Sequence, residues 1–412
     1  ERVVRSDWVI DCAGGNGPLT RHFGGRKTDP TLRNIAVFGY HKGVIRDPAL
    51  CGHAGSDRTV ILTHPSGWLW VIPVQKDVVS LGFVTSVDAY KQANASSPEA
   101  FFEQRLTELP EFDAMLSNAE RVDYRGDGRG LYTVKEYSYS CQRLRGPGWA
   151  LCGDAAGFVD AILSIGCFLA QNHAQFLAYA LGSVLDESCP EELALDSYET
   201  VVKDNLDSFR TVARMFYAFG PTMSPWWRAC SDELRRSATV PSGADRDAFV
   251  AFLSGMTARN ALYETALGAF GGRFLSDVGA QLFGEHPDYP NAALERAAFE
   301  AKSQIRKDAV MRLTSSCVAR DFALPRTGTG RLEPLTRLEI DDRSGGDFDG
   351  LRRLHVPTVL ATIPALLDGT RSLAQVADKL CRQGLDLDEN TAWREVAKVA
   401  YRLHAMGAAE RV

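Results

Sequence analysis

The feature that most constrains this chain is a short apolar strand followed directly by a small-residue loop and a long apolar segment. Residues Trp149–Cys152 form the apolar run, Gly153 and Asp154 end it, and Cys167–Leu185 have the composition of a buried helix. This order aims backbone N–H groups and the positive end of a helix at one point, which suits an anion or a phosphorylated cofactor. Asp154 adds a carboxylate that can accept hydrogen bonds from a sugar hydroxyl. Alone, the pattern is equally typical of an ordinary turn with a helix cap.

Short apolar or alternating runs dominate residues 35–140 and predict an antiparallel sheet. The segments His64–Gly67 and Gln75–Asp77 separate consecutive runs as hairpin turns, and helices are expected to begin at Pro98 and Pro110. An antiparallel sheet with one covered face would form the wall of a substrate cavity.

One of these runs carries two tryptophans. Trp68, Trp70 and Ile72 alternate along the strand and therefore point to the same face, and Pro73 ends the pairing. On spacing alone, a pair of core aromatics is the more frequent explanation.

Two segments of the chain resemble a known family. Residues 153–160, Gly-Asp-Ala-Ala-Gly-Phe-Val-Asp, resemble the second flavin-binding signature of FAD-dependent monooxygenase-type enzymes, and residues 163–166 resemble its continuation in flavin-dependent halogenases. Residues 68–73 are similar to the Trp-x-Trp-x-Ile-Pro signature of the same halogenases, and the two segments occur in the order of that family. Ala161 stands where the family usually has Pro, and Ile165 where Ser or Thr is common.

The resemblance implies a halogenation chemistry. In the family, a separate flavin reductase supplies reduced FAD, O2 converts it to a flavin hydroperoxide, and a chloride or bromide ion attacks to give hypohalous acid. That species crosses a tunnel to an electron-rich aromatic or pyrrole substrate with the help of a Lys. Some relatives act on substrates tethered to an acyl or peptidyl carrier protein, in natural-product and antibiotic biosynthesis.

The resemblance also implies roles for individual residues. The halide would bind the backbone N–H groups of Ile165 and Gly166, at the start of a helix. The motif beside the flavin would consist of Trp68, Trp70, Ile72 and Pro73. The expected FAD contacts are Asp11, Gly14, Gly153, Asp154, Ala155, Gly157, Asp160, Gly166 and Cys167.

The N-terminal segment differs from the family pattern. A predicted strand, Val3–Ile10, leads into Asp11–Gly17, which resembles a segment that in the family follows a first β-α-β unit with Gly-x-Gly-x-x-Gly. Gly15 and Gly17 begin that pattern, but Thr20 replaces its third Gly. We therefore expect the sequence to lack the first dinucleotide-binding segment and the tunnel Lys, and the chain alone to bind FAD weakly. A polar surface turn is the alternative explanation of the segment.

The predicted fold class is α/β (α+β), a flavin monooxygenase-like or halogenase-like fold with an incomplete Rossmann-type FAD domain. The small C-terminal module resembles a winged helix, with Ser372 as the N-cap of one of its helices. Its composition favours a lid or docking role. The expected domains are a partial FAD-binding domain (residues 1–30 and 145–190), an antiparallel-sheet substrate domain (31–144), a helical region (191–325) and the C-terminal module (350–412).

Two other functions remain open at this point. Ala161 and Ile165 keep an aromatic hydroxylase on the same flavin scaffold in consideration. The absent dinucleotide unit keeps a noncatalytic protein that binds a carrier protein in consideration.

Composition excludes several classes. A net charge of −6 over 412 residues argues against nonspecific nucleic-acid binding. Nine cysteines, without a Cys-x-x-Cys or metal-ligand spacing, indicate a reduced cytoplasmic protein. Amides and a histidine in the apolar segment 167–185 favour a core helix over a membrane span.

Overall fold

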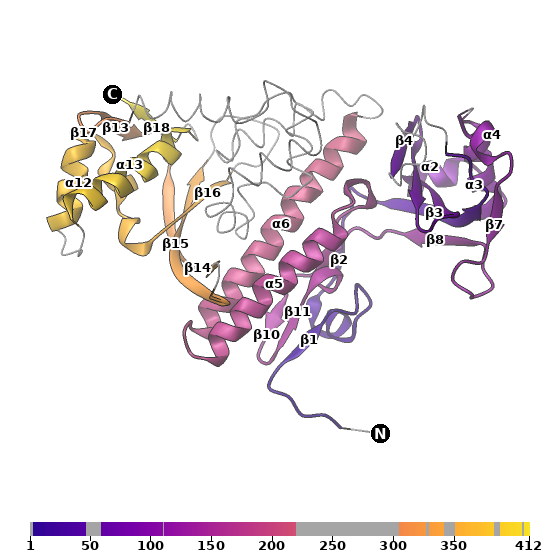
Figure 1. Ribbon diagram of the computed structural model, residues 1–412, viewed down its shortest axis with the longest axis horizontal. Helices are drawn as coiled ribbons and strands as arrows, with labels where there is room; N and C mark the ends of the chain where they lie inside the picture. Colours follow the sequence, from indigo (N-terminus) through magenta and orange to yellow (C-terminus); the bar gives the residue numbers. More distant parts are fainter. Residues whose placement is uncertain are drawn as a thin grey trace.

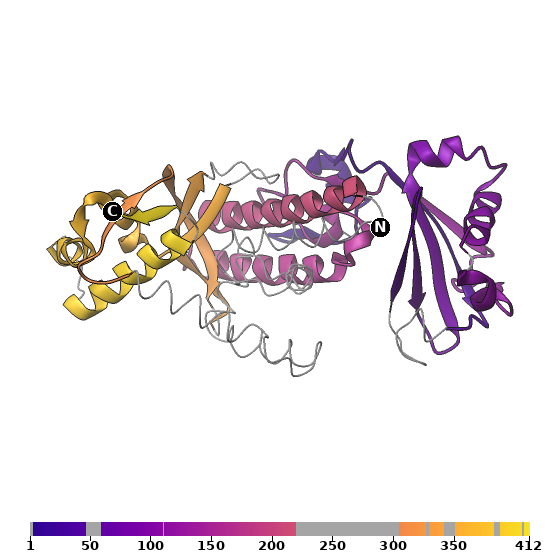
Figure 2. The same ribbon diagram turned by 90° about the horizontal axis from the view of Figure 1, so that it is seen from above.

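The computed structural model describes residues 3–46, 59–109, 111–219, 305–326, 329–341, 351–382, 388–405 and 408–412. An antiparallel sheet lies at one end, a pair of long helices in the middle and a small C-terminal unit at the other end (Figures 1 and 2). The architecture is therefore mixed α/β, as the sequence predicts. The part of the expected helical region that spans residues 220–304 lies outside the described residues.

A short parallel pair of strands organises the middle of the molecule. Strand β1 (Val9–Asp11) pairs in parallel with β11 (Trp149–Leu151), and β10 (Arg145–Gly146) pairs antiparallel to β11. The predicted strand from Val3 was too long, because Val3 and Val4 are exposed and pair with nothing among the described residues. Since β1 and β11 are parallel, the loops that follow them begin at the same edge.

Three short strands form a separate small sheet. Strands β2 (Lys27–Thr28) and β12 (Gly157–Phe158) flank β9 (Tyr139–Ser140) in a three-stranded antiparallel sheet.

The predicted antiparallel sheet is present and has six strands. Its order is β4-β5-β6-β3-β7, and β8 also pairs with β3. The tight turn between β4 and β5 joins His64 to Gly67 in direct register, as the turn residues predict. The strands are β3 (Asn34–Lys42), β4 (Val60–His64), β5 (Gly67–Pro73), β6 (Val78–Ser86), β7 (Glu120–Val122) and β8 (Leu131–Lys135).

The two faces of this sheet bury different cores. Leu69 and Val71 of β5 pack with Phe101 and Phe102 of α3 (Pro98–Thr107) in one core. The shorter helices α2 (Val87–Gln92) and α4 (Glu111–Leu116) belong to the same region.

The opposite face carries the two tryptophans of β5. Trp68 is buried in the central core, and its ring centroid lies 5.8 Å from that of Trp70. Alternation along the strand thus places both rings on one face, as predicted.

Helices α5 (Gly166–Leu185) and α6 (Glu191–Phe219) pack against each other and against a second sheet (Figure 1). That sheet contains β14 (Cys317–Arg326), β15 (Arg331–Asp341) and β16 (Leu351–Val356) in sequence order.

The predicted helical region is therefore wrong for residues 310–325, which form β13 (Val310–Leu313) and most of β14. The physical reason is pairing over long stretches: β14 pairs with β15 from Cys317–Ile340 to Arg326–Arg331, and Phe322 and Leu324 join the core beside α6.

The C-terminal unit has its own core. Strand β13 lies between β17 (Asp368–Ser372) and β18 (Ala409–Arg411), so its sheet takes a strand from before the predicted boundary at residue 350. Its helices are α11 (Ile363–Leu366), α12 (Leu373–Arg382) and α13 (Glu389–Ala405).

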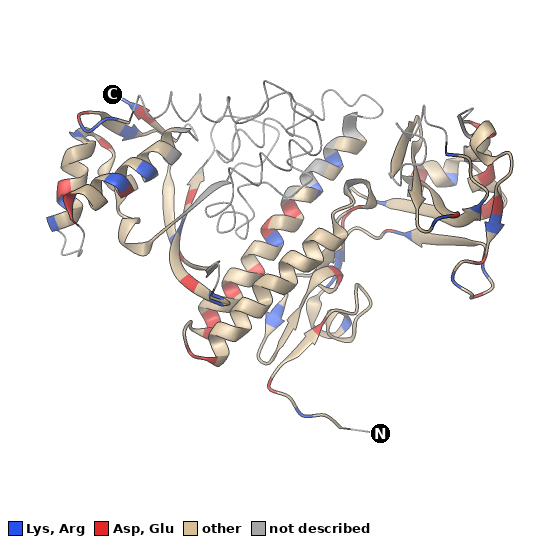
Figure 3. Cartoon of the chain, viewed as in Figure 1, with Lys and Arg blue, Asp and Glu red and all other residues tan. Residues whose placement is uncertain are grey.

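The predicted N-cap of α12 is confirmed. The Ser372 Oγ accepts a hydrogen bond from Gln375 N at 3.3 Å, and Gln375 Oε1 accepts one from Ser372 N at 2.8 Å. The resemblance of the unit to a winged helix stays a prediction. Basic and acidic positions are mixed over the described part of this unit (Figure 3).

The described residues contain neither a membrane-spanning helix nor a metal-binding cluster. No helix among them has the length and apolarity needed to cross a membrane. Over the same residues, no group of three His, Cys, Asp or Glu side chains could hold a metal ion.

A buried ion pair joins the second sheet to α6 and gives a test of the fold. The Arg337 side chain is 3% exposed, and its guanidinium lies 2.7 Å from Asp204 and 3.3 Å from Glu339. Arg337→Met should lower the free energy of unfolding by about 3–5 kcal/mol, because it removes the buried cation that lies between the Asp204 and Glu339 carboxylates. Urea unfolding measures the change.

The matched control lies on the neighbouring strand. Arg320 is 64% exposed and pairs with the same Glu339 at 2.8 Å. Arg320→Met should cost less than about 1 kcal/mol, because the pair is solvent-exposed. Equal losses in the two variants would contradict the proposed importance of the buried pair.

Candidate functional site

The first loop of the site is held by the carboxylate of Asp11, at the end of β1. Asp11 is buried, and its oxygens accept hydrogen bonds from the backbone N–H of Ala13 (2.9 Å), Leu19 (2.8 Å) and Thr20 (3.2 Å). A Cβ at Gly17 would lie 2.3 Å from Asp11 Oδ1, so the chain needs glycine there. Asp11 therefore stabilises the conformation of the loop that follows it. The expected contact of Asp11 with FAD stays a prediction.

The second loop follows β11 and is fastened to the first. Thr20 Oγ1 donates to the carbonyl of Ala155 at 3.0 Å, and the Tyr139 hydroxyl donates to the carbonyl of Asp154. Arg26 donates to the carbonyl of Gly15 at 2.9 Å, and its guanidinium lies 4.0 Å from the centre of the Tyr139 ring. These contacts fix the two loops relative to each other.

The loop residues that are expected to contact FAD fall into two groups, which differ in whether protein encloses them. Gly14, with φ +79°, has open space around the position of a Cβ, and the Asp154 side chain is exposed. Partial burial raises the pKa of the Asp154 carboxyl, and no described residue donates a hydrogen bond to it. Neither position is enclosed by the described residues.

The other group is enclosed by protein. A Cβ at Gly153 would touch Ala170 of α5 at 3.2 Å, and one at Gly157 would touch Leu206 of α6 at 2.7 Å. Ala155 is fully buried. These three residues permit close packing of the loop against the helices.

The start of α5 lacks a side-chain cap. Ile165 is the N-cap residue, makes no side-chain hydrogen bond and is buried, while Ser164 before it has φ +52°. The first N–H groups of a helix have no partner within the helix. Gly166 approaches Phe158, with 3.6 Å to the position of a Cβ, and the thiol-bearing Cys167 is exposed. The positive end of α5 thus has no capping side chain from its N-cap residue.

Asp160 lies at the centre of a buried hydrogen-bond network. Its Oδ1 accepts from Ile162 N at 3.0 Å and from the Tyr217 hydroxyl at 2.9 Å, and its Oδ2 accepts from Asn34 Nδ2 at 3.0 Å. Tyr217 in turn accepts from Trp68 Nε1 at 3.0 Å. Asp160, expected to touch FAD, is instead directed at β3 and α6.

The network explains the direction of two pKa shifts. Burial raises the pKa of the Asp160 carboxyl, and the hydrogen bonds that the carboxyl accepts oppose that shift. Burial, and then the nearby charge of Asp160, hold the pKa of Tyr217 well above its ordinary value. The sequence does not mark Asn34 and Tyr217 as site residues, because no local pattern identifies residues whose partner lies more than fifty positions away.

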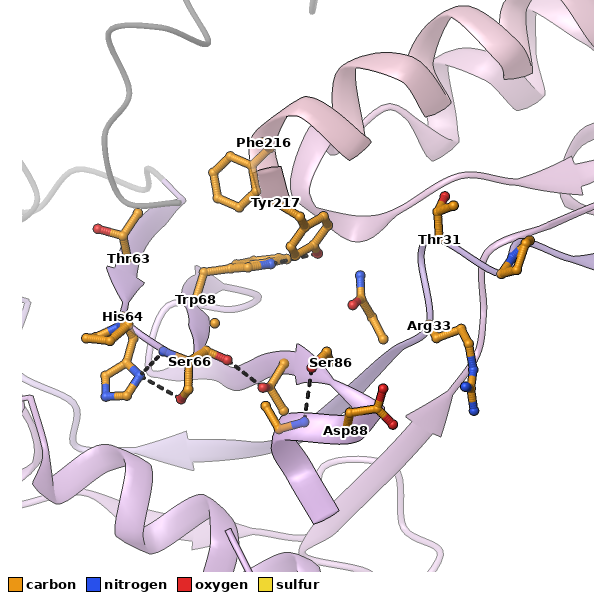
Figure 4. Close-up of a pocket in the computed structure, with 16 residues that line it drawn as sticks. Thr31, Arg33, Thr63, His64, Ser66, Trp68, Ser86, Asp88, Phe216 and Tyr217 are labelled. Carbon is orange, nitrogen blue, oxygen red and sulfur yellow. Dashed lines mark hydrogen bonds between the residues drawn. The ribbon is translucent and has the colours of Figure 1, made fainter. Parts of the chain in front are cut away.

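Beside this network lies a cavity of about 430 Å³, between the antiparallel sheet and the end of α6 (Figure 4). The rings of Trp68 and Tyr217 lie on one side, near Phe216, and polar groups including Ser86 and Asp88 lie on another. The lining residues are Pro30, Thr31, Arg33, Asn34, Thr63, His64, Pro65, Ser66, Gly67, Trp68, Thr85, Ser86, Asp88, Ala89, Phe216 and Tyr217.

Of the four residues expected in the Trp-x-Trp-x-Ile-Pro motif, only Trp68 lines this cavity. Trp70 is directed at the neighbouring strand: its Nε1 donates to Ser80 Oγ at 3.2 Å. Ile72 and Pro73 lie further along β5, at its far end. The structure therefore does not bring the four residues together in this cavity.

The family of the chain follows from comparison with known proteins. The sequence model of the tryptophan halogenase family matches residues 1–246. The chain belongs to the tryptophan halogenase family, which confirms the resemblance to flavin-dependent halogenases.

Individual relatives agree with this result. The flavin-dependent halogenase ptaM of Pestalotiopsis fici is 31% identical over 212 residues, which are 50% of this chain and 38% of that protein. A 1H-pyrrole-2-carbonyl peptidyl-carrier protein brominase of Pseudoalteromonas luteoviolacea is 31% identical over 190 residues, 45% and 44% of the two chains. The chain therefore matches less than half the length of either relative.

A solved structure supports the fold. The flavin-dependent halogenase CmlS superposes with a TM-score of 0.55 at 21% identity, covering 99% of this chain and 70% of that one. At this identity the likeness concerns the fold alone.

Tyr217→Phe tests the Asp160 network. The substitution removes one donor from a buried carboxylate and the acceptor of Trp68, so it should lower the free energy of unfolding by about 1–3 kcal/mol at pH 7. The loss should shrink as the pH falls through the raised pKa of Asp160, because the Tyr217 bond favours the ionised form, which is then depleted. Urea unfolding of both proteins at pH 7 and pH 5 measures this.

Tyr132→Phe is the matched control. The Tyr132 hydroxyl donates at 2.9 Å to Asp127, which lies on an exposed loop. This variant should lose less stability than Tyr217→Phe. A Tyr217→Phe penalty that is small, or that grows toward acid pH, would show that Tyr217 does not stabilise an ionised Asp160.

Proposed function

We propose that this chain contributes to an FAD-dependent halogenase that halogenates an electron-rich aromatic or pyrrole ring. The observation that carries the proposal is that Asp160, just before the uncapped start of α5 in the chain, is hydrogen-bonded to Asn34 and Tyr217, which line an aromatic-walled cavity. A halogenase needs a halide site and a substrate cavity, because halide oxidation and substrate binding are separate.

The two loops have the features of part of a flavin site. They begin at the carboxyl ends of adjacent parallel strands, where open α/β sheets bind nucleotides. Gly14 leaves room for close approach, and Asp154 offers exposed carboxylate oxygens to ribityl or ribose hydroxyls. Reduced FAD, when bound, would react with O2 and so supply the oxidant for the halide. The residues of this chain would bind and orient it.

The start of α5 is the proposed halide site. Ile165 has no side-chain acceptor, so no capping side chain occupies the positive end of α5, and the N–H groups of Ile165 and Gly166 are proposed to donate to a chloride or bromide ion there. The burial of Ile165 keeps the adjoining core dry, which strengthens the attraction of a helix end for an anion.

The proposed partners follow from the relatives. One of them is named as a brominase of a pyrrole tethered to a peptidyl carrier protein, so a carrier-protein-tethered substrate is proposed here as one substrate class. A separate flavin reductase would supply reduced FAD. The C-terminal unit is proposed as the docking surface for a partner protein.

Product analysis tests the proposal. The protein is incubated with FAD, a flavin reductase, NADH, O2, chloride or bromide, and a phenol or pyrrole substrate. The expected product carries the isotope pattern of the halogen in its mass spectrum. A product that gains oxygen without halogen would overturn the halogenase proposal and favour the aromatic hydroxylase, which Ala161 and Ile165 keep as the second candidate. Failure of the whole protein, and not only of this chain, to bind FAD would favour a noncatalytic carrier-binding role.

Asp154→Ala tests the flavin assignment. The variant should bind FAD about 10- to 150-fold more weakly, because it loses a charged hydrogen bond worth ~1.5–3 kcal/mol. Flavin fluorescence titration measures the affinity. Asp127→Ala, which changes an exposed carboxylate on a loop beyond β7, is the control and should leave the affinity unchanged. Equal affinities of Asp154→Ala and the unaltered protein would reject the contact.

A further inference from the structure

We propose that the cavity beside Trp68 selects aromatic rings that carry a hydrogen-bond donor, and that the side-chain oxygen of Asn34 accepts that hydrogen. The donor is a neutral O–H or N–H, as in a phenol, an indole or a pyrrole. This inference rests on the proposed function, which supplies the aromatic substrate, and it narrows the substrate class.

The orientation of the Asn34 amide is set by Asp160. An ionised carboxylate can only accept hydrogen bonds, so Asn34 must present its NH2 group to it. Asn34 Nδ2 donates to Asp160 Oδ2 at 3.0 Å, while Ile162 N and the Tyr217 hydroxyl donate to Oδ1. These three donors stabilise the ionised form of Asp160. The Oδ1 atom of Asn34 is therefore turned away from Asp160.

The remaining groups of Asn34 are already paired. Its backbone N–H donates to the carbonyl of Leu32 at 3.0 Å, and its carbonyl accepts from Glu136 N at 2.8 Å. The residue is 4% exposed and lines the cavity. Among the described residues, none donates a hydrogen bond to Asn34 Oδ1. The cavity thus contains an oriented acceptor for which a ligand can supply the hydrogen.

Most other polar groups around the cavity are bound to protein. Thr85 Oγ1 donates to the carbonyl of Ser66, Ser86 Oγ accepts from Ala89 N, and Arg33 pairs with Glu136 at 2.9 Å. Ser66 Oγ lies 2.9 Å from His64 Nδ1 (Figure 4). Because these groups satisfy one another, they compete little with Asn34 for a ligand. The Asp88 carboxylate also lines the cavity, but it is exposed to solvent, whereas Asn34 is buried.

The aromatic side of the cavity suits a flat ring. Trp68 is held by its bond to Tyr217, and both rings lie beside the cavity in Figure 4. Neither indole N–H nor phenol O–H of this pair is available to the ligand, since both donate within the network. The pair therefore offers ring surface, and Asn34 offers the polar contact. A volume of about 430 Å³ lies within the range of small-molecule sites.

A ligand without the donor leaves the acceptor unpaired in a buried place. An unpaired buried acceptor costs about 1–3 kcal/mol, so a methylated analogue should bind roughly 5- to 150-fold more weakly than its parent. The methyl group also occupies the space where the hydrogen pointed.

The test measures binding without flavin, by ligand-observed NMR titration of the whole chain. The probes are phenol against anisole, and indole against 1-methylindole. Phenol and indole should bind at least about fivefold more tightly than their methylated analogues. Anisole binding as tightly as phenol, or no binding of any probe, would overturn the inference.

Three variants locate the effect. Asn34→Leu should abolish the preference for the donor-bearing probes, whereas Thr63→Val, at another lining position, should keep it. Asp160→Asn should reduce the preference although Asn34 is intact, because an amide at position 160 no longer dictates which way Asn34 points. Thus, if Asn34→Leu does not fold, Asp160→Asn still decides, and an unchanged preference in either folded variant would contradict the proposal.

The outcome is separable from that of the proposed function. Halogenated product formed by a protein that does not prefer phenol over anisole would leave the halogenase proposal standing and overturn the role of Asn34. Conversely, the protein could prefer phenol over anisole, lose that preference in Asn34→Leu and yet form no halogenated product. That result would support the role of Asn34 and overturn the halogenase proposal.

Discussion

The buried carboxylate of Asp160 is the contact on which the site depends. A carboxylate removed from water is costly unless donors surround it. Asp160 receives them from three segments: its own loop through Ile162, strand β3 through Asn34, and the end of α6 through Tyr217. Because each bond comes from a different element, the position of this one side chain determines how the sheet, the helix and the loop meet.

The three aspartates of the candidate site show how environment separates residues of one type. The Asp11 oxygens accept hydrogen bonds from the backbone of the loop that follows β1. The Asp160 oxygens accept hydrogen bonds from side chains of the core. Asp154 alone is exposed and accepts no hydrogen bond from the described residues. All three appear equivalent in a motif, but only Asp154 has a carboxylate directly available to a bound molecule.

Local patterns predicted local structure well. The turn at His64–Gly67 and the N-cap at Ser372 need only neighbouring residues, and both are present. The short motif around Asp154 likewise identified a loop between a strand and a long helix.

Long-range contacts could not be predicted in the same way. The Trp68–Tyr217 bond joins residues 149 positions apart, and Asn34 and Asp160 are 126 positions apart. Strand β13 pairs with β17 and β18, far along the chain, so composition near residue 310 gave no indication of its partners. A single sequence carries the residue types of such contacts but not their pairing.

The two tryptophans of β5 show a related limit. They share a face, as alternation requires, but their cross-strand partners on β6 differ: Trp68 lies opposite Val84 and Trp70 opposite Gly82. A Cβ at Gly82 would lie 2.1 Å from the Trp70 ring, so that ring covers the space left by the missing side chain and bonds to Ser80. Val84 leaves no such space, and Trp68 reaches Tyr217 instead. The residues that face the two tryptophans on β6 therefore decide, as much as the tryptophan motif itself, that Trp68 and not Trp70 reaches the cavity.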